Sequence, residues 1–379
     1  MDFIFQSNKY KSVFADTQSA PAQQIALSLL TCSAYLSNQR KKCVKVNITM
    51  DKIKTAVVGV GSLGQHHLKW LSRIENSELV GFYDIDTECR ARFAKKYDNI
   101  IVFESLAQVA EMVEVVTIVV PTSEHCEVAS FLIDKGVHCL IEKPVTATLD
   151  EATTLQEKAR TTGAKVAVGH IERFNPAVQA VLEMGVKPAF IEAHRLAAFD
   201  PRGTDVAVVR DLMIHDIDLV LTFIESEITD IQASTVAVVS DQADIANARL
   251  TFACGAVANL TASRISLHQM RKLRIFQQSS YFSLDLAQKQ ADIYRLAAQG
   301  EVGEGLRIPI GKSDRKLIYT RKQDSGEDML QMELSAFLRA VQDDKPVSVS
   351  LEQGTEALRV ALEVERIGQE SLNRMLTQN

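Results

Sequence analysis

Hydrophobic and polar positions between residues 53 and 169 alternate in a way that predicts a parallel sheet. Short apolar, β-branched runs are separated by amphipathic stretches of helical spacing, which is typical of strands joined by crossover helices. The expected strands are Thr55–Val60, Leu79–Tyr83, Val115–Val120, Val137–Ile141 and Lys165–Gly169. The expected helices are His66–Ile74, Glu88–Lys96, Glu124–Lys135 and Leu149–Thr162.

The pattern changes after Pro176. One helical stretch, Asp211–Ile224, comes before several long runs of strand composition. Because these runs follow one another without helices, they predict a mostly antiparallel open sheet. Two amphipathic helices close the chain, separated by a segment with Pro346, which cannot continue a helix. The expected strands are Ile228–Val239, Asn247–Phe252, Ala256–Ser263 and Lys272–Gln277, with a hairpin turn at Cys254-Gly255, and the closing helices are Met329–Gln342 and Leu351–Leu372.

The residues of one expected strand alternate between the two faces of the second sheet. Ala248, Leu250 and Phe252 alternate with polar residues, and we expect this apolar face to pack on helices. The opposite face could pair with a second copy of the chain. We therefore expect a homodimer or a homotetramer.

A glycine-rich loop, Gly59-Val60-Gly61-Ser62-Leu63-Gly64, follows the first expected strand. In this setting the first glycine allows a tight turn, the second lets a pyrophosphate approach the backbone, and the third lets the helix pack on the strand. Asp84 ends the second strand, where a carboxylate accepts hydrogen bonds from a ribose diol and repels a 2′-phosphate. The sequence therefore favours NAD over NADP. The alternative is a glycine turn and a surface aspartate.

These features predict an α/β protein of two domains. The first is a Rossmann fold, a doubly wound parallel sheet, and the second is an α+β domain with a mostly antiparallel open sheet. We assign residues 1–49 to a disordered or appended leader, 50–173 to the NAD-binding domain and 174–379 to a domain for substrate binding and oligomerisation. The last helices could pack back on the first domain.

Composition narrows the classes of function. The 379 residues carry a net charge of −6 without a dense Lys/Arg block, so we expect no nucleic-acid partner. The six cysteines form no CxxC pair, so we expect neither a metal site nor a disulfide framework, and a reducing cytoplasm fits best. The apolar stretch Ile25–Leu36 is too short to cross a bilayer, so we expect no membrane association. A secretory signal is the alternative.

Two more loops follow expected strands at the edge where ligands of doubly wound sheets bind. The first is Pro121-Thr122-Ser123-Glu124-His125, and the second is Glu142-Lys143-Pro144. The first loop could serve only to begin a helix, with Thr122 or Ser123 as its cap. Lys143 could be no more than a solvated charge.

With these loops and the segment Asp211-Leu-Met-Ile-His215-Asp-Ile-Asp218, the chain resembles the glucose-fructose oxidoreductase/inositol dehydrogenase (Gfo/Idh/MocA) family from about Ile53 to Leu372. The resemblance implies a dehydrogenase that transfers hydride from a sugar CH–OH group to NAD. It implies that Lys143, Asp211 and His215 form the catalytic group. The residues that it implies for cofactor binding are Gly59, Gly61, Ser62, Leu63, Gly64, Asp84, Pro121, Thr122, His125, Glu142 and Lys143.

The residues themselves agree with these roles. Asp211 and His215 are four positions apart, so on a regular α-helix they share one face. A histidine can accept a hydroxyl proton near neutral pH, and a lysine beside it would stabilise the developing alkoxide. The alternative is a buried, hydrogen-bonded histidine and an aspartate favoured by the helix dipole. Asp216 and Asp218 are expected to be supporting acids or surface charges.

The segment from His170 to Pro176 ends the first domain. The resemblance places it at the cleft, which makes Arg173 and Asn175 candidates for contact with the nicotinamide or the substrate. The alternative is a linker in which Glu172 and Arg173 form an ion pair.

The substrate is indicated only by the resemblance. This segment and the loop Phe199–Asp205 are most similar to the branch of the family that oxidises the 3-hydroxyl of UDP-N-acetylglucosamine. A dehydrogenase of inositol or another free sugar is the alternative, and a regulatory NAD(H)-binding protein without catalysis is a third reading. Convergence of Lys143, Asp211 and His215 on one point would argue against the third. A diphosphate needs cationic donors, and those available are Arg195, Arg202, Arg264 and Arg271.

Overall fold

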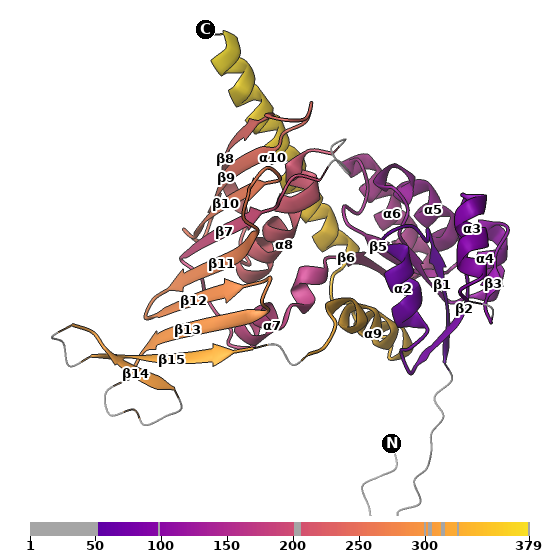
Figure 1. Cartoon of the computed structure of the whole chain (residues 1–379), viewed down its shortest axis with the longest axis horizontal. Coiled ribbons are helices and arrows are strands. Elements are labelled where there is room, and N and C mark those ends of the chain that lie inside the picture. Colours follow the sequence, from indigo (N-terminus) through magenta and orange to yellow (C-terminus); the bar gives the residue numbers. More distant parts are fainter. Residues whose placement is uncertain are drawn as a thin grey trace, which may run out of the picture. The chain divides into compact units, whose positions relative to one another are not determined.

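The computed structural model describes residues 52–97, 99–200, 206–298, 301, 305–311, 315–323 and 326–377 (Figure 1). The expected leader, residues 1–49, and the candidate substrate ligand Arg202 lie outside the described residues. Within the described part, no helix combines the length and the apolar character that a membrane span requires.

The first sheet has six strands in the order β3-β2-β1-β4-β5-β6, and every pair is parallel. The order reverses between β1 and β4, and ligands of doubly wound sheets bind outside the carboxyl ends of the strands at such a point. The predicted Rossmann fold is therefore confirmed. The strands are β1 Ile53–Val58, β2 Ser77–Tyr83, β3 Ile101–Val102, β4 Val115–Ile118, β5 His138–Glu142 and β6 Val166–Gly169.

Helices cover both faces of this sheet. One buried cluster joins one face to α4, α5 and α6, and another joins the opposite face to α2, α3 and α9. The short elements β3 and α4 were not expected, because two and seven residues are too few to show a clear period. The helices are α2 Gly64–Leu71, α3 Thr87–Ala94, α4 Leu106–Met112, α5 Thr122–Asp134, α6 Leu149–Thr162 and α9 Met329–Gln342.

The second sheet has nine strands in the order β14-β15-β13-β12-β11-β7-β10-β9-β8 (Figure 1). Only β7 and β10 pair in parallel, so the predicted antiparallel character is confirmed. The strands are β7 Phe190–Leu196, β8 Ile228–Val236, β9 Ile245–Phe252, β10 Val257–Ser263, β11 Met270–Gln277, β12 Ser280–Asp285, β13 Gln290–Leu296, β14 Leu306–Pro309 and β15 Lys316–Lys322. The elements packed on one face of this sheet or leading to it are the 3₁₀ turn η1 Ile171–Phe174, α7 Pro176–Leu182, the π-helical turn η2 Val209–Met213, α8 Ile214–Phe223 and α10 Leu351–Thr377.

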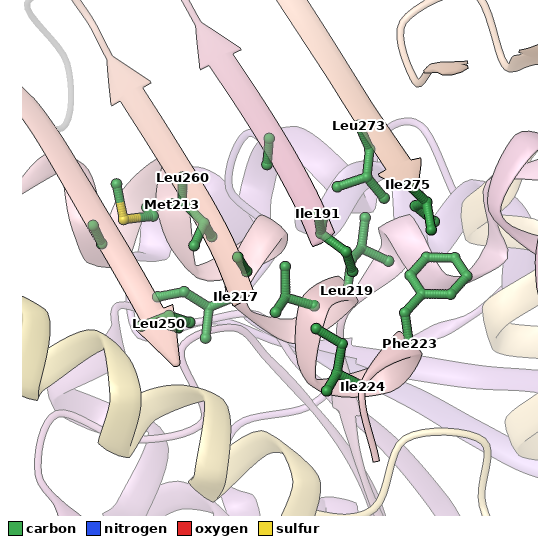
Figure 2. Packing of buried hydrophobic residues seen from close by; sticks show 14 of the residues in the cluster. Ile191, Met213, Ile217, Leu219, Phe223, Ile224, Leu250, Leu260, Leu273 and Ile275 are labelled. Carbon is green, nitrogen blue, oxygen red and sulfur yellow. The ribbon is translucent and has the colours of Figure 1, made fainter. Parts of the chain in front are cut away.

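A continuous apolar core lies between this sheet and α8. Figure 2 shows Ile217 and Phe223 pointing at side chains of the strands, among them Leu250 and Leu273. Ala248, Leu250 and Phe252 are buried while Arg249 is exposed, which confirms the two predicted faces. The core fixes α8, and the turn η2 before it, against the sheet.

The C-terminal segment packs on the edge of the first sheet. The Val168 amide donates a hydrogen bond to the Val349 carbonyl oxygen at 3.2 Å, and Ala167 and Ser350 form an antiparallel bridge. Gly354 of α10 then contacts Val168, because a Cβ atom at Gly354 would lie 2.5 Å from Val168 Cγ2 and 2.9 Å from its Cβ. Helix α10 therefore approaches β6 as closely as its backbone allows.

Replacing Gly354 by valine should destabilise the protein. The added side chain overlaps Val168, whose β-branched side chain has no room to turn away, and such overpacking costs about 1–3 kcal/mol. Chemical denaturation, read as the midpoint and slope of unfolding, measures the loss. Glu352→Val is the matched control, because it places the same residue on an exposed position of α10; equal midpoints for the two variants would contradict the close approach.

Candidate active site

The glycine loop between β1 and α2 is folded as its sequence predicts. Gly59 has a φ of +88°, which favours glycine, and a Cβ there would lie 2.4 Å from the Val119 carbonyl oxygen. A Cβ at Gly64 would lie 1.9 Å from the Gly59 carbonyl oxygen. The first and third glycines therefore bring β1, β4 and α2 into close contact.

The middle of this loop faces open space. A Cβ at Gly61 would have no neighbour within 4 Å, and Ser62 and Leu63 are exposed. Leu63 stands at the N-cap of α2 without a side-chain hydrogen bond to the helix. The amide groups at the start of α2 are thus not capped by a side chain, which suits the binding of a pyrophosphate.

Asp84 lies against the same loop. Its Oδ2 accepts a hydrogen bond from the Val60 amide at 2.7 Å, and its Oδ1 accepts one from the Asp86 amide at 2.9 Å. Each carboxylate oxygen can accept a further hydrogen bond. The carboxylate therefore braces the loop and can still bind a ribose diol.

Glu142, at the end of β5, is joined to α2. Its Oε1 lies 3.2 Å from Nε2 of the fully buried His67, and its Oε2 accepts a hydrogen bond from the Lys143 amide at 3.2 Å. Burial alone would raise the pKa of Glu142, but the hydrogen bond and charge of His67 and the charge of Lys143 hold this pKa below its usual value. A negative Glu142 thus anchors the loop that carries Lys143.

His125 connects two loops at the same edge of the sheet. It is buried, with Nδ1 2.9 Å from the Pro144 carbonyl oxygen and Nε2 3.0 Å from that of Val120. Burial lowers the pKa of this histidine, although both carbonyl groups oppose the shift, so the neutral ring donates to only one of them. His125 therefore holds the loops together from inside, while Pro121 is exposed and Thr122 begins α5 rather than capping it.

The side chain of Lys143 contacts the turn η2, which leads into α8. Its Nζ donates a hydrogen bond to the Asp211 carbonyl oxygen at 2.8 Å and lies 3.8 Å from Asp211 Oδ1. Asp211 Oδ2 lies 3.8 Å from NH2 of Arg264. Burial lowers the pKa of Lys143 against the opposing effects of Asp211 and Glu142. The predicted partners Lys143 and Asp211 are therefore in contact.

The turn that carries Asp211 differs from the expected helix. Val209–Met213 is π-helical, and the regular helix α8 begins only at Ile214. The expected regular helix from Asp211 therefore begins with a π-helical turn, and the shared face of Asp211 and His215 stays a prediction. π-Helical turns occur frequently at functional sites, and this one directs the Asp211 carbonyl oxygen to Lys143.

His215 lies within the electrostatic reach of Lys143. Its ring is half-buried, and Nδ1 is enclosed without a hydrogen-bond partner among the described residues. Burial lowers its pKa well below the usual value, and the positive charges of Lys143 and Arg195 lower it further. His215 is therefore neutral at neutral pH, which is the form that accepts a proton.

Arg173 and Asn175 both bind other parts of the chain, although Arg173 also lines a pocket of about 540 Å³ beside α9. Arg173 makes two hydrogen bonds to Asp218, at 2.6 and 2.9 Å. Asn175 is fully buried, donates to Glu172 Oε2 and the Leu286 carbonyl oxygen, and caps α7 through its Oδ1. Both side chains have partners within the chain, and their contact with nicotinamide or substrate stays a prediction. The alternative, a pair between Glu172 and Arg173, was wrong, because Arg173 pairs with Asp218 and Glu172 with Arg195.

A buried ion cluster beside the site was not expected. Arg195 of β7 makes two hydrogen bonds to Asp216, at 2.9 and 3.1 Å, and one to Glu172 at 2.9 Å. Burial opposes the charge of Arg195, but the carboxylates of Asp216 and Glu172 outweigh it and raise its pKa. Since the three residues come from separate parts of the chain, no local pattern reveals them. Arg195 is thus not free for a diphosphate.

Arg264 and Arg271 also act on the candidate catalytic group. Arg264 is buried and donates to the Val206 carbonyl oxygen at 2.5 Å. Arg271 is exposed, and its charge contributes to the lowered pKa of His215. Among the described residues, no group of three or more His, Cys, Asp or Glu side chains is arranged to hold a metal ion.

Comparison with known proteins agrees with this arrangement. Residues 53–170 match an oxidoreductase family with an NAD-binding Rossmann fold, and residues 189–279 match the GFO/IDH/MocA C-terminal domain. UDP-N-acetylglucosamine 3-dehydrogenase of Acidithiobacillus ferrooxidans is 38% identical over 316 residues, which cover 83% of this chain and 97% of that protein. A solved structure of UDP-N-acetylglucosamine 3-dehydrogenase from the same organism superimposes with a TM-score of 0.76 at 36% identity over 84% of this chain and 98% of that chain.

A more distant relative acts on a free polyol. The scyllo-inositol 2-dehydrogenase (NAD⁺) of Bacillus subtilis is 27% identical over 270 residues, which cover 66% of this chain and 78% of that protein. Both domains match the family models, and the A. ferrooxidans protein is 38% identical over nearly its whole length. The chain is an NAD-binding oxidoreductase of the Gfo/Idh/MocA family.

Proposed function

We propose that the protein oxidises the 3-hydroxyl of UDP-N-acetylglucosamine to a ketone, with NAD as the hydride acceptor. The observation that carries the chemistry is the contact of Lys143 with Asp211, with His215 neutral and within reach of the lysine charge. The relative of A. ferrooxidans supports the choice of sugar, because the similarity extends over nearly its whole length.

The residues assigned to the cofactor lie near the carboxyl ends of the strands of the first sheet. The open side of the glycine loop and the uncapped start of α2 suit the pyrophosphate, and Asp84 suits the adenosine ribose. NAD, when bound, supplies the carbon that takes up the hydride. The residues we assign to its binding are Gly59, Gly61, Ser62, Leu63, Gly64, Asp84, Pro121, Thr122, Glu142 and Lys143, with His125 positioning the loops from within.

Each catalytic residue has a distinct task. The ammonium group of Lys143 stabilises negative charge on the substrate oxygen as the hydride leaves. Neutral His215 accepts the hydroxyl proton, and Asp211 fixes Lys143 through its carbonyl oxygen. We assign the diphosphate of the substrate to Arg271, which is exposed, because a diphosphate needs cationic donors.

The outer face of the second sheet supports a homo-oligomer. No described helix covers this face, and five neighbouring strands contribute one aromatic ring each to a row with centroid distances of 4.8 to 5.6 Å. The five residues are half-buried, and a row of aromatic rings on a sheet face that no described helix covers is typical of protein interfaces. We infer a homodimer or homotetramer formed through this face. The row consists of Phe190, Phe276, Tyr281, Tyr294 and Tyr319.

Two further assignments follow from the same observations. The four described cysteines are unpaired, which supports a reducing compartment such as the cytoplasm. A dehydrogenase of inositol or another free sugar is the second candidate function, and it is favoured by the similarity to scyllo-inositol 2-dehydrogenase.

A substrate panel tests the proposed reaction. Wild-type protein with NAD should produce NADH from UDP-N-acetylglucosamine and not from UDP-glucose, myo-inositol or free sugars, measured by nicotinamide absorbance. Lys143→Met should lower kcat by at least about 100-fold, because the charge that stabilises the alkoxide is lost. The control is Lys158→Met, which removes a lysine of α6 that forms an ion pair with Asp134 of α5. Turnover of myo-inositol instead would establish the second candidate function.

The choice of cofactor is tested at Asp84. Asp84→Ala should weaken NADH binding by about tenfold and reduce the discrimination against NADPH, because both the ribose acceptor and the repulsion of a 2′-phosphate disappear. Calorimetric titration measures both affinities. Asp86→Ala removes a charge of the same sign that instead caps α3, so equal losses in the two variants would refute a direct role for Asp84.

The protonation state of His215 predicts how activity depends on pH. Because the pKa of His215 lies well below its usual value, kcat/KM should stay constant as pH falls to about 6.5, the ordinary histidine value, and decline only below it. The pH profiles of wild type and His215→Asn measure this, and the variant should lose the acidic decline together with most of its activity. A decline that begins above about pH 6.5 would show that another group is the base.

A further inference from the structure

Helix α9 carries a buried carboxyl group for which the proposed mechanism has no use. Glu333 is 3% exposed, and neither Oε1 nor Oε2 has a hydrogen-bond partner among the described residues. Its neighbours on α9 include Leu334 and Phe337, which belong to the core under the first sheet. An unpartnered polar group in such a place costs stability, so its presence calls for a functional explanation.

Glu333 is surrounded by other ionisable groups. Burial raises its pKa well above the usual value, and the negative charges of Glu142 and Asp218 raise it further. The other ionisable groups on α2 and η1, which pack against α9, are His66, His67 and Lys69 of α2 and Glu172 and Arg173 of η1. Glu333 therefore keeps its proton to a higher pH than an ordinary glutamate.

A second buried side chain without a hydrogen-bond partner shares charged neighbours with this carboxyl group. His170 is buried, and its ring nitrogens have no hydrogen-bond partner among the described residues. Its Nδ1 lies 3.9 Å from Asp218 Oδ2, and the charges of Lys143 and Glu142 also act on the ring. The charges of Asp218 and Glu142 thus act on both His170 and Glu333.

Glu333 also lines a small cavity between α9 and the first sheet. The cavity has about 10 Å³ of water-accessible space, which is room for roughly one water molecule. Two of its lining residues, Phe174 and Ser348, also line a larger pocket of about 540 Å³. This pocket includes Gln331 and Ser335 of α9, and it contains no residue of the glycine loop or of the Glu142-Lys143-Pro144 loop.

We propose that Glu333 is a proton-relay residue that connects the site around Lys143 with solvent on the α9 side. The inference rests on the proposed function, in which a carbinol is oxidised. The C–H bond gives its hydride to NAD, the O–H bond gives its proton to His215, and the C=O bond forms. The proton then passes by way of His170 and the carboxylates Asp218 and Glu142 to Glu333, while Glu333 releases its own proton through the cavity.

This path would let the proton reach solvent while the ligands are bound. A cofactor and a sugar bound over Lys143 cover the direct way from the catalytic group to water. A route through the interior lets the proton leave before the ligands do. Glu333 suits this task, because a carboxylic acid can give up one proton on one side and take up another on the opposite side.

The test compares Glu333→Gln with Ser335→Ala. Glutamine keeps the shape of the side chain but cannot carry a proton, whereas Ser335 lines the larger pocket from the same helix. In Glu333→Gln, kcat should fall by about tenfold with unchanged KM values for NAD and sugar, and the solvent deuterium isotope effect on kcat should increase. Ser335→Ala should behave as wild type. A wild-type kcat and isotope effect in Glu333→Gln would overturn the proposal.

Two readouts need no turnover. The infrared band of a protonated carboxylic acid should be present in the wild type at neutral pH and absent in Glu333→Gln; its absence from the wild type would overturn the proposal. Since a buried acid with a raised pKa loses stability as pH rises, Glu333→Gln should gain in melting temperature more at about pH 8 than at about pH 6. The kinetic test uses whichever sugar the wild type oxidises, so failure with UDP-N-acetylglucosamine alone would refute only the proposed substrate.

Discussion

The hydrogen bond from Lys143 Nζ to the Asp211 carbonyl oxygen determines the geometry of the candidate site. It joins the end of β5 in the first sheet to the π-helical turn that leads into α8. An ammonium group has three donors, and the carbonyl oxygen uses one, while Asp211 Oδ1 at 3.8 Å is beyond hydrogen-bond distance. Two donors therefore remain for a substrate oxygen, and the backbone rather than a mobile carboxylate sets their direction.

Buried ion pairs hold the two sides of this contact in place. Arg195 binds Asp216 and Glu172, and Arg173 binds Asp218. Through these pairs η1, which follows β6 of the first sheet, is tied to β7 and α8. Buried pairs pay a large desolvation cost and add little net stability, so their value here is geometric. They fix the position of α8, and with it Asp211 and His215, relative to Lys143.

Sequence reasoning succeeded where the pattern is local and failed where it is not. Runs of adjacent residues define the glycine loop, the Lys143 loop and α6, and the positions of all three in the chain were predicted correctly. Strand β7 was missed, because buried Arg195 and outward Leu196 invert the usual alternation of apolar and polar residues. Asn175 was a candidate for contact with nicotinamide or substrate because the resemblance placed its segment at the cleft, but in the structure it binds Glu172 and the distant Leu286 carbonyl oxygen. Glu333 shows no sequence signal, since its isolation appears only after α9 packs.

The segment before α10 has one more consequence, which concerns association between molecules. Strand β6 is the last strand of the parallel sheet, and the exposed backbone of an edge strand can pair with a strand from another chain. The bridge between Ala167 and Ser350 and the bond to Val349 occupy this backbone. The segment Val349–Ser350 thus covers this edge, so the backbone of β6 is shielded from other chains only after residues far beyond β6 have been synthesised.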